Sequence, residues 1–421
     1  MPFLNKIAVY ALCMGFLLSG CVTNDGGSEG TALNIDHLIG PKLSSFFDPK
    51  RKAKVDTDKP KLDIVVPVFD PGLSEDAKNY KEEGVWPELR RAEANRFAYN
   101  LKTALEAIGA FGAVRITPDN TATGDIYVIG KIVESNGEDV EIEVVVTDIS
   151  GNPWFTRNFD HTVDPGFHKN PRNNGKDPYD PMFEEAANRI ALELEAYSSD
   201  QLVTLKRITE LRFGSNFTQE AFSKHLLIED GKAKLRSFPS ETDPMFQRTQ
   251  AIRVRDQLFT DGLQDTYQSF SERMEASYLI WQEQSLLEIE TKSEVTRKAA
   301  GEAVLGILAI GVAVAAVVAG ADANQAGDYG GGALANTGAI LAGVAGATLL
   351  QNSFQTSEEA KVHRDALAEM GESINIDLSP QVIAFEEQTV KLTGDAKAQF
   401  SQWREFLKKI YEEEQTPEVQ L

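Results

Sequence analysis

The strongest constraint on the fold is an apolar segment that follows residue 300. Its first part, AVLGILAIGVAVAAVVAGA at 303–321, contains no charged side chain, and its second part at 333–350 is again uncharged. As a helix, the first part would rise roughly 28 Å at about 1.5 Å per residue, which is close to the thickness of a bilayer core. We therefore expect residues 301–350 to form a hairpin of two apolar helices.

Glycines punctuate both halves of this hairpin and decide how its helices can pack. Small residues let two helix backbones approach closely, which favours face-to-face packing. The composition resembles that of glycine-zipper segments. The glycines expected to make the packing face are Gly306, Gly311, Gly320, Gly338, Gly343 and Gly346.

The sequence is compatible with three environments for the hairpin. In the first, the hairpin inserts in an outer membrane as an oligomer, because its modest Ala/Gly hydrophobicity lets it pass the inner membrane during export. In the second, it is the buried core of a soluble assembly. Asp322 and Asp328 favour this second reading, since a monomer would have to carry both charges across lipid. In the third, it spans the inner membrane.

We expect residues 1–20 to be a signal peptide. Lys6 precedes an uncharged stretch at 7–20 that ends in small residues, and about 14 apolar residues are short for a membrane span. The junction resembles the lipobox of bacterial lipoproteins, and this resemblance implies that Cys21 is acylated and becomes the first residue of the mature chain. The lipobox residues are Leu18, Ser19, Gly20 and Cys21.

The lipid anchor determines the expected location. Val22, rather than an aspartate, follows the cysteine, which resembles the signal that releases lipoproteins to the outer membrane. Several acyl chains make such an anchor stable. The second cysteine, Cys13, lies in the signal peptide, so no internal disulfide is expected. We thus expect an outer-membrane protein that is lipid-anchored on the periplasmic face.

Charge and length exclude other classes. Asp and Glu number 64 and Lys and Arg 42, so the formal net charge is −22. That charge repels phosphate backbones, and no nucleic-acid partner is expected. A chain of 421 residues is long enough for more than one hydrophobic core.

The expected fold class is α+β, built from a small α/β sandwich domain, a long-helix region with the apolar hairpin, and a small C-terminal ββα element. The domain begins with an apolar run typical of a strand that is covered on both faces. Asn136-Gly137 then predicts a hairpin between two strands. The order is a strand at 62–69, a helix from about 86 to 108, strands at 113–117, 125–134, 140–148 and 154–159, and a helix from about 180 to 194. The expected boundaries are 1–20 for the signal peptide, 21–60 for a flexible tether, 61–198 for the α+β domain, 199–300 for the helical region, 301–350 for the hairpin and 351–421 for the ββα element.

The first domain carries a family resemblance. The order IVVPVF, amphipathic helix, GDIYVIGKI, VEIEVVVTDISGNPWF and DPYDPMFEEAANRIALEL resembles a domain of curli-secretion-type outer-membrane lipoproteins. The N-terminal domain of the Tol-Pal translocation protein and lipoprotein activators of penicillin-binding proteins share it. The resemblance covers roughly 60–198 and implies a role in envelope assembly or interaction, with no active site. The chain departs from the curli type by lacking a pair of long alternating strands for membrane insertion.

The helical region contains one long amphipathic helix. Asp243-Pro244 is typical of a helix cap and first residue, and Asp230-Gly231 predicts a hairpin turn before it. An apolar stripe repeats at spacings of three and four, which indicates a packed seam or coiled-coil self-association. Its members are Leu263, Tyr267, Phe270, Met274, Tyr278 and Trp281. The last element should place two short strands before a helix with an apolar face at Phe400, Trp403, Leu407 and Ile410.

The search for chemistry finds no catalytic, metal or cofactor site. The best cluster is a Pro/Gly/Asn-rich stretch whose side chains could ring Zn²⁺ or Ca²⁺, but its spacing matches no zinc or EF-hand pattern. We interpret it as a solvated loop with Asp-Pro turns. Its members are Asp160, His161, Asp164, His168, Asp177 and Asp180. Trp86 and Trp154 are interface candidates if they are exposed, with core packing as the default.

These features predict a non-enzymatic lipoprotein that is a structural or assembly component of an envelope complex. Its partners would be the membrane, through the lipid anchor, and either its own copies or other envelope proteins. The alternative is a lipoprotein regulator that binds a periplasmic enzyme such as a peptidoglycan synthase. A metal-dependent envelope enzyme comes third, and it would require bound metal that disappears on His161→Ala or His168→Ala.

Overall fold

The computed structural model describes residues 51–74, 80, 85–305, 360–385 and 388–414. All of them belong to one compact unit, Lys42–Leu421. The fold class is α+β, as predicted from the sequence, and it includes the C-terminal ββα element. The predicted signal peptide, the lipobox and the Gly-rich segment after residue 305 lie outside the described residues.

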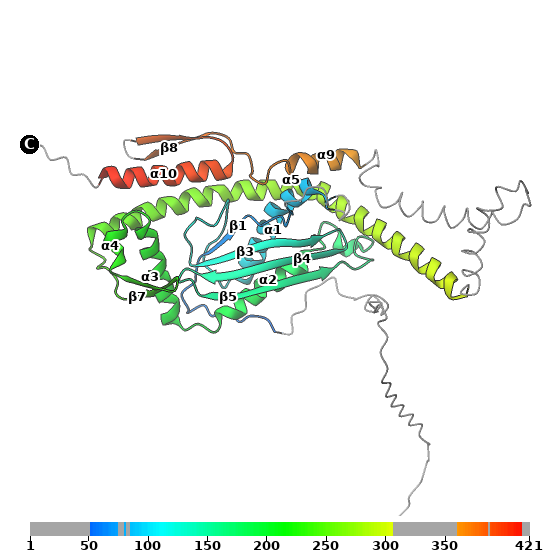
Figure 1. The fold of residues 1–421 in the computed structure, drawn as a ribbon, viewed down its shortest axis with the longest axis horizontal. Coiled ribbons are helices and arrows are strands. Elements are labelled where there is room, and N and C mark those ends of the chain that lie inside the picture. Colours follow the sequence, from blue (N-terminus) through cyan, green and yellow to red (C-terminus); the bar gives the residue numbers. More distant parts are fainter. Residues whose placement is uncertain (1–50, 75–79, 81–84, 306–359, 386–387, 415–421) are drawn as a thin grey trace, which may run out of the picture. The chain divides into compact units, whose positions relative to one another are not determined.

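A five-stranded mixed sheet forms the first half of this unit, in the order β2-β1-β3-β4-β5 (Figure 1). β1 pairs in parallel with both β2 and β3, whereas β3, β4 and β5 form an antiparallel meander. The predicted hairpin at Asn136-Gly137 is confirmed, with Gly137 at φ 101°, a conformation that favours glycine. The strands are β1 Ile64–Pro67, β2 Val114–Thr117, β3 Ile126–Ser135, β4 Asp139–Asp148 and β5 Pro153–Thr162.

Two helices, α1 (Pro87–Ile108) and α2 (Asp180–Leu194), cover one face of the sheet (Figure 1). Alternate residues of β4, from Val140 to Val146, are buried under them, as the period-2 pattern predicts. The rings of Phe97 and Phe183 join the helices edge to face at 5.2 Å. The opposite face presents Ile129 and Val133, which are 36% and 47% exposed.

A long helix, α5, runs from Pro244 to Leu305 as one element of 62 residues. Asp243 caps it, because its carboxylate accepts hydrogen bonds from the backbone N–H groups of Met245 and Phe246. The six stripe residues predicted from Leu263 to Trp281 are all buried, which confirms a packed seam. α5 lies against α9 (Lys361–Met370), α1 and β2.

Smaller elements surround α5. Both residues of the predicted turn between β6 and β7 have positive φ, 50° at Asp230 and 76° at Gly231. α10 packs on α5 through Trp403, whose ring stacks on Phe259 at 5.0 Å. The remaining elements are a 3₁₀ turn at Pro171–Asn173, α3 Ser199–Ser215, α4 Gln219–Ser223, β6 Leu226–Glu229, β7 Lys232–Leu235, α9 Lys361–Met370, β8 Gln381–Phe385, β9 Gln388–Leu392 and α10 Ala396–Glu414.

Among the residues that the structure describes, no helix is both long enough and apolar enough to cross a membrane.

Candidate functional site

The residues that the sequence marks as functional are not placed by the structure. The lipobox at 18–21 and the glycine face of the hairpin both fall outside the described ranges. The structure instead places the chain from Arg51 onward, 30 residues after Cys21, and α5 as far as Leu305, directly before Gly306. The candidate site is therefore the set of contacts through which the α+β domain holds these two segments.

A buried ion pair joins α1 to the loop before α2, and α5 packs on both of its members. The guanidinium of Arg96 donates from Nε and Nη2 to Asp177 Oδ2, at 3.2 and 2.9 Å, and both side chains are nearly buried, at 4% and 6% exposure. Arg96 Nη1 also donates to the carbonyl of Ser271 at 3.1 Å, and the guanidinium lies over the ring of Tyr278. Gln282 donates to Asp177 Oδ1 at 3.1 Å. α5 thus contributes partners to both members of the pair.

A second buried acid lies one turn earlier on α1. Glu93 Oε1 accepts hydrogen bonds from Ser135 Oγ on β3, at 2.6 Å, and from the Tyr278 hydroxyl on α5, at 2.8 Å. Arg90 Nε lies 3.7 Å from the other carboxylate oxygen. Burial raises the pKa of Glu93, against the opposing effects of Arg90 and of these hydrogen bonds. Together, Glu93, Arg96, Ser135, Asp177, Tyr278 and Gln282 form what we call the junction network.

Tyr179, which packs beside the junction network, and α5 hold the β3–β4 turn. The backbone N–H of Gly137 donates to the hydroxyl of Tyr179 at 2.8 Å, and the ring of Tyr179 meets that of Tyr278 edge to face at 6.4 Å. A Cβ added at Gly137 would lie 2.4 Å from the Cβ of Ser285 on α5. Glycine is therefore required here for close approach to α5 as well as for the turn.

α5 closes one edge of the sheet through a single glutamine. The side chain of Gln264 accepts a hydrogen bond from the Ile116 N–H and donates one to the Ile116 carbonyl, both at 2.9 Å. This pair of bonds replaces those that a further strand would make with the edge strand β2. An open edge is a template for pairing with other chains, and α5 removes that template at β2.

The chain that leads into the domain is held along α2. Asn188 accepts from the Ala53 N–H at 2.9 Å and donates to the Arg51 carbonyl at 3.0 Å, so one amide holds the backbone of an extended segment. Glu195 accepts from the Lys54 N–H at 2.8 Å and pairs with the side chain of Arg51. Residues 51–54, which the sequence assigns to the tether, are thus bonded to the domain.

The Asp/His-rich stretch is more structured than the solvated loop that the sequence suggests. Asp177 is in the buried ion pair with Arg96, which corrects its assignment to a solvated turn. His168 lies against the ring of Phe167 at 5.2 Å, and His161 lies on β5. Among the described residues of 51–305 and 360–414, no three His, Cys, Asp or Glu side chains are grouped so that they could hold a metal ion.

The two tryptophans proposed as interface candidates are both partly buried against the core. The indole of Trp154 stacks on Tyr197 at 5.1 Å and donates from Nε1 to Asp148 at 3.2 Å. Trp86 immediately precedes α1 at its N-terminal cap position. Packing, the default interpretation, accounts for the surroundings of both residues.

Sequence reasoning missed the junction network. Its clearest signal is that Glu93 stands four residues before Phe97 and eight before Leu101, on the buried stripe of α1. A charged residue on such a stripe indicates a buried partner. No spacing rule points to Gln264 or Asn188, because their partners are backbone groups far away in the chain.

Comparison with known proteins provides no relative: no protein-family model, curated protein or solved structure matches this chain. The resemblance of residues 60–198 to the curli-secretion-type domain therefore stays a prediction.

Proposed function

We propose that the chain is an outer-membrane lipoprotein, facing the periplasm, that acts as a structural or assembly component of an envelope complex. In this proposal it is anchored through Cys21 and oligomerises or inserts through the Gly-rich segment 301–350. One observation carries the proposal. α5 is a single helix that packs on the domain along its seam and reaches Leu305, directly before the Gly-rich sequence.

The contacts of α5 support a rigid connection between the α+β domain and the segment 301–350. The seam, the junction network and the Gln264 bonds tie α5 to three different parts of the domain, namely α1, β2 and the loop before α2. Protein interiors have few discrete packing arrangements and transmit displacement. An assembly formed by residues 301–350 would therefore set the orientation of each attached domain.

The chain that enters the domain is also held in place, at Arg51 and Ala53. Arg51 and Ala53 are bonded to α2, and Cys21 lies 30 residues before Arg51. A fully extended chain of that length reaches at most about 100 Å, at about 3.3–3.6 Å per residue. A lipid at Cys21 therefore keeps the domain within that distance of the membrane surface.

A second candidate function, regulation of a periplasmic enzyme, rests on the sheet face opposite α1 and α2. That face presents the exposed side chains of Ile129 and Val133 beside the partly exposed Glu141 and Glu143. Apolar side chains rimmed by charges are typical of contact surfaces between proteins. This face presents two exposed apolar side chains, whereas the seam of α5 buries six, and we rank the regulator second.

Site-specific photo-crosslinking in cells separates the two functions. A photo-reactive residue replaces Val312 in the hairpin, Val133 on the sheet face, or Lys397 on the exposed side of α10 as the control. The assembly proposal predicts crosslinks between two copies of this chain from position 312. Crosslinks only from position 133, and only to one other protein, would favour the regulator and contradict the proposal.

A further inference from the structure

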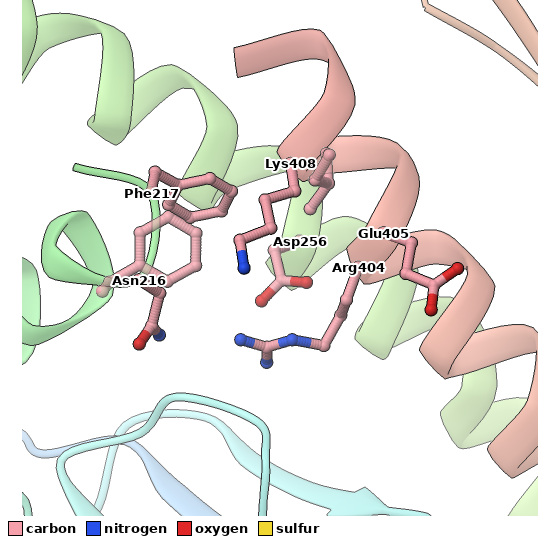
Figure 2. A pocket seen from close by; sticks show the side chains of 8 residues that line it. Asn216, Phe217, Asp256, Arg404, Glu405 and Lys408 are labelled. Atoms are coloured by element: carbon pink, nitrogen blue, oxygen red, sulfur yellow. The ribbon is translucent and has the colours of Figure 1, made fainter. Parts of the chain in front are cut away.

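A groove lies between α1 and α2, beside the chain that enters the domain, and its volume is about 560 Å³. It is larger than the pocket around Asp256, where α10 crosses α5, which measures about 300 Å³ and is lined by charged side chains of both signs (Figure 2). Lys52, the second residue of the described chain, lines the groove. The chain that precedes Arg51 therefore continues from the edge of this groove.

The floor of the groove is apolar. Tyr99, Ala104 and Ile108 of α1 line it and are only partly buried against the core. Val55, from the entering chain, lines it too and is 40% exposed. Apolar side chains left partly exposed in a concave surface are typical of a site that receives another apolar group.

The entering chain runs alongside α2 in the same direction as the helix. Asn188 is bonded to the backbone of Arg51 and Ala53, and Glu195, about two turns further along α2, is bonded to the N–H of Lys54. Followed backward from Arg51, the chain therefore heads toward the N-terminal end of α2, whose side chains line the groove.

Length decides which residue reaches that end. Asp180 lines the groove eight residues before Asn188, which is about 12 Å along the helix at about 1.5 Å per residue. An extended chain covers that distance in about four residues at about 3.3 Å each, and the fourth residue before Arg51 is Phe47. Pro49 favours an extended path, because a proline disfavours helical conformation in the residue before it.

Side-chain alternation selects Phe47 over its neighbour Phe46. In an extended chain, every second side chain lies on the same face. Ala53 and Val55 both line the groove, and Phe47 is in phase with them, whereas Phe46 is out of phase.

We propose that the segment 46–50 of this chain occupies the groove, with the ring of Phe47 against Tyr99 and Ala104. An aromatic ring buries about 150–250 Å², so it covers apolar surface that α1 and α2 leave open. The tether then leaves the domain at the N-terminal end of α2. This inference does not depend on the proposed role in assembly, because neither Cys21 nor the segment 301–350 contributes to the groove.

Photo-crosslinking of the full chain in cells identifies what lies in the groove. A benzophenone side chain replaces the phenyl ring of Phe47, and mass spectrometry of the crosslinked peptides locates the attached residue. We expect attachment to residues 99–104 or 180–184 of the same chain. The control places the benzophenone at Asp56, an exposed position beyond Val55, from which no crosslink to these two ranges is expected.

The other products overturn the proposal. A crosslinked dimer would show that the groove receives this segment from a second copy of the chain. Attachment only to another protein, or only to lipid, would show that the segment lies away from the groove. Absence of any crosslink from position 47 would likewise show that no groove residue is in contact with it.

A thiol in the groove measures the covering independently. Thr103 lines the groove and is exposed, so the thiol introduced by Thr103→Cys should be alkylated slowly, because a covered thiol reacts only when the covering segment opens. We expect Phe47→Ser to raise the alkylation rate at least about fivefold, and Phe46→Ser, the matched control, to change it less than about twofold. The thiol introduced by Glu106→Cys, on the same helix but outside the groove, should react at a rate that neither substitution changes.

Circular dichroism spectra equal to that of the parent chain ensure that both serine variants stay folded. Equal alkylation rates for Phe47→Ser and Phe46→Ser, or rates that neither substitution changes, would overturn the proposal.

Discussion

The Arg96–Asp177 pair allows the sharpest test of how α5 is held. Replacing Arg96 with methionine keeps much of the apolar stem but leaves the Asp177 carboxylate without its cation. In the structure, that change deletes two hydrogen bonds to Asp177 and one to the Ser271 carbonyl on α5. Breaking a buried pair from one side costs about 3–5 kcal/mol, because an uncompensated charge remains in the interior. We expect Arg96→Met to lower the free energy of unfolding by that amount.

Equilibrium urea unfolding of the full chain, followed by circular dichroism, measures the effect. Lys102→Met is the matched control on the same helix, since it removes the ion pair with Glu106, and it should cost at most about 0.5 kcal/mol. Adding Asp177→Asn to Arg96→Met should restore at least about 1 kcal/mol, because the lone charge causes most of the loss. A loss below about 1 kcal/mol for Arg96→Met, or losses that simply add in the double variant, would refute the reasoning.

Three further predictions concern other contacts. The stability of Glu93→Gln relative to the parent chain should increase as the pH rises above the ordinary carboxyl pKa of 4.5, because a raised pKa in the folded state means that folding favours the protonated acid. Unfolding free energies of both chains between about pH 4 and pH 8 check this, and a difference between the two chains that does not change with pH would contradict it. Gln264→Ala should lower the free energy of unfolding by about 1–3 kcal/mol, because it leaves the buried Ile116 N–H and carbonyl without hydrogen-bond partners. Thermal unfolding measures the loss, and a Tm equal to that of the exposed-site control Gln268→Ala would contradict the role of Gln264 at the β2 edge. Cys21→Ser should abolish incorporation of radiolabelled palmitate in cells, and labelling that persists would show that another residue carries the lipid.

Much of the fold was predictable from local patterns. The alternation from Val140 to Val146 indicated one buried face, and Asn136-Gly137 indicated the turn. Asp243 before Pro244 marked the start of α5, since a capping carboxylate and a first-turn proline act locally. These signals need no knowledge of distant residues.

The rest depends on contacts that local patterns do not encode. β1 lies between β2 and β3 in the sheet, and the order of strands along the chain does not specify this parallel pairing. α9 was not predicted, because only a short apolar pattern around Leu367 marks it. The pocket around Asp256 joins three helices whose residues are as many as 195 positions apart, from Phe213 to Lys408. The lipobox and glycine face, by contrast, were readable from the sequence and stay predictions.

The central claim is that residues 301–350 assemble copies of a lipid-anchored chain. Multi-angle light scattering of the full chain, extracted in detergent from outer membranes, tests it most directly. The account predicts an oligomer for the parent chain and for Gly262→Ala, a helix position where an added Cβ meets open space. It predicts a monomer when Gly311→Leu and Gly343→Leu are combined, because larger side chains prevent close helix approach. A monomeric parent chain, or an oligomer that is unchanged by the paired substitution, would contradict the account.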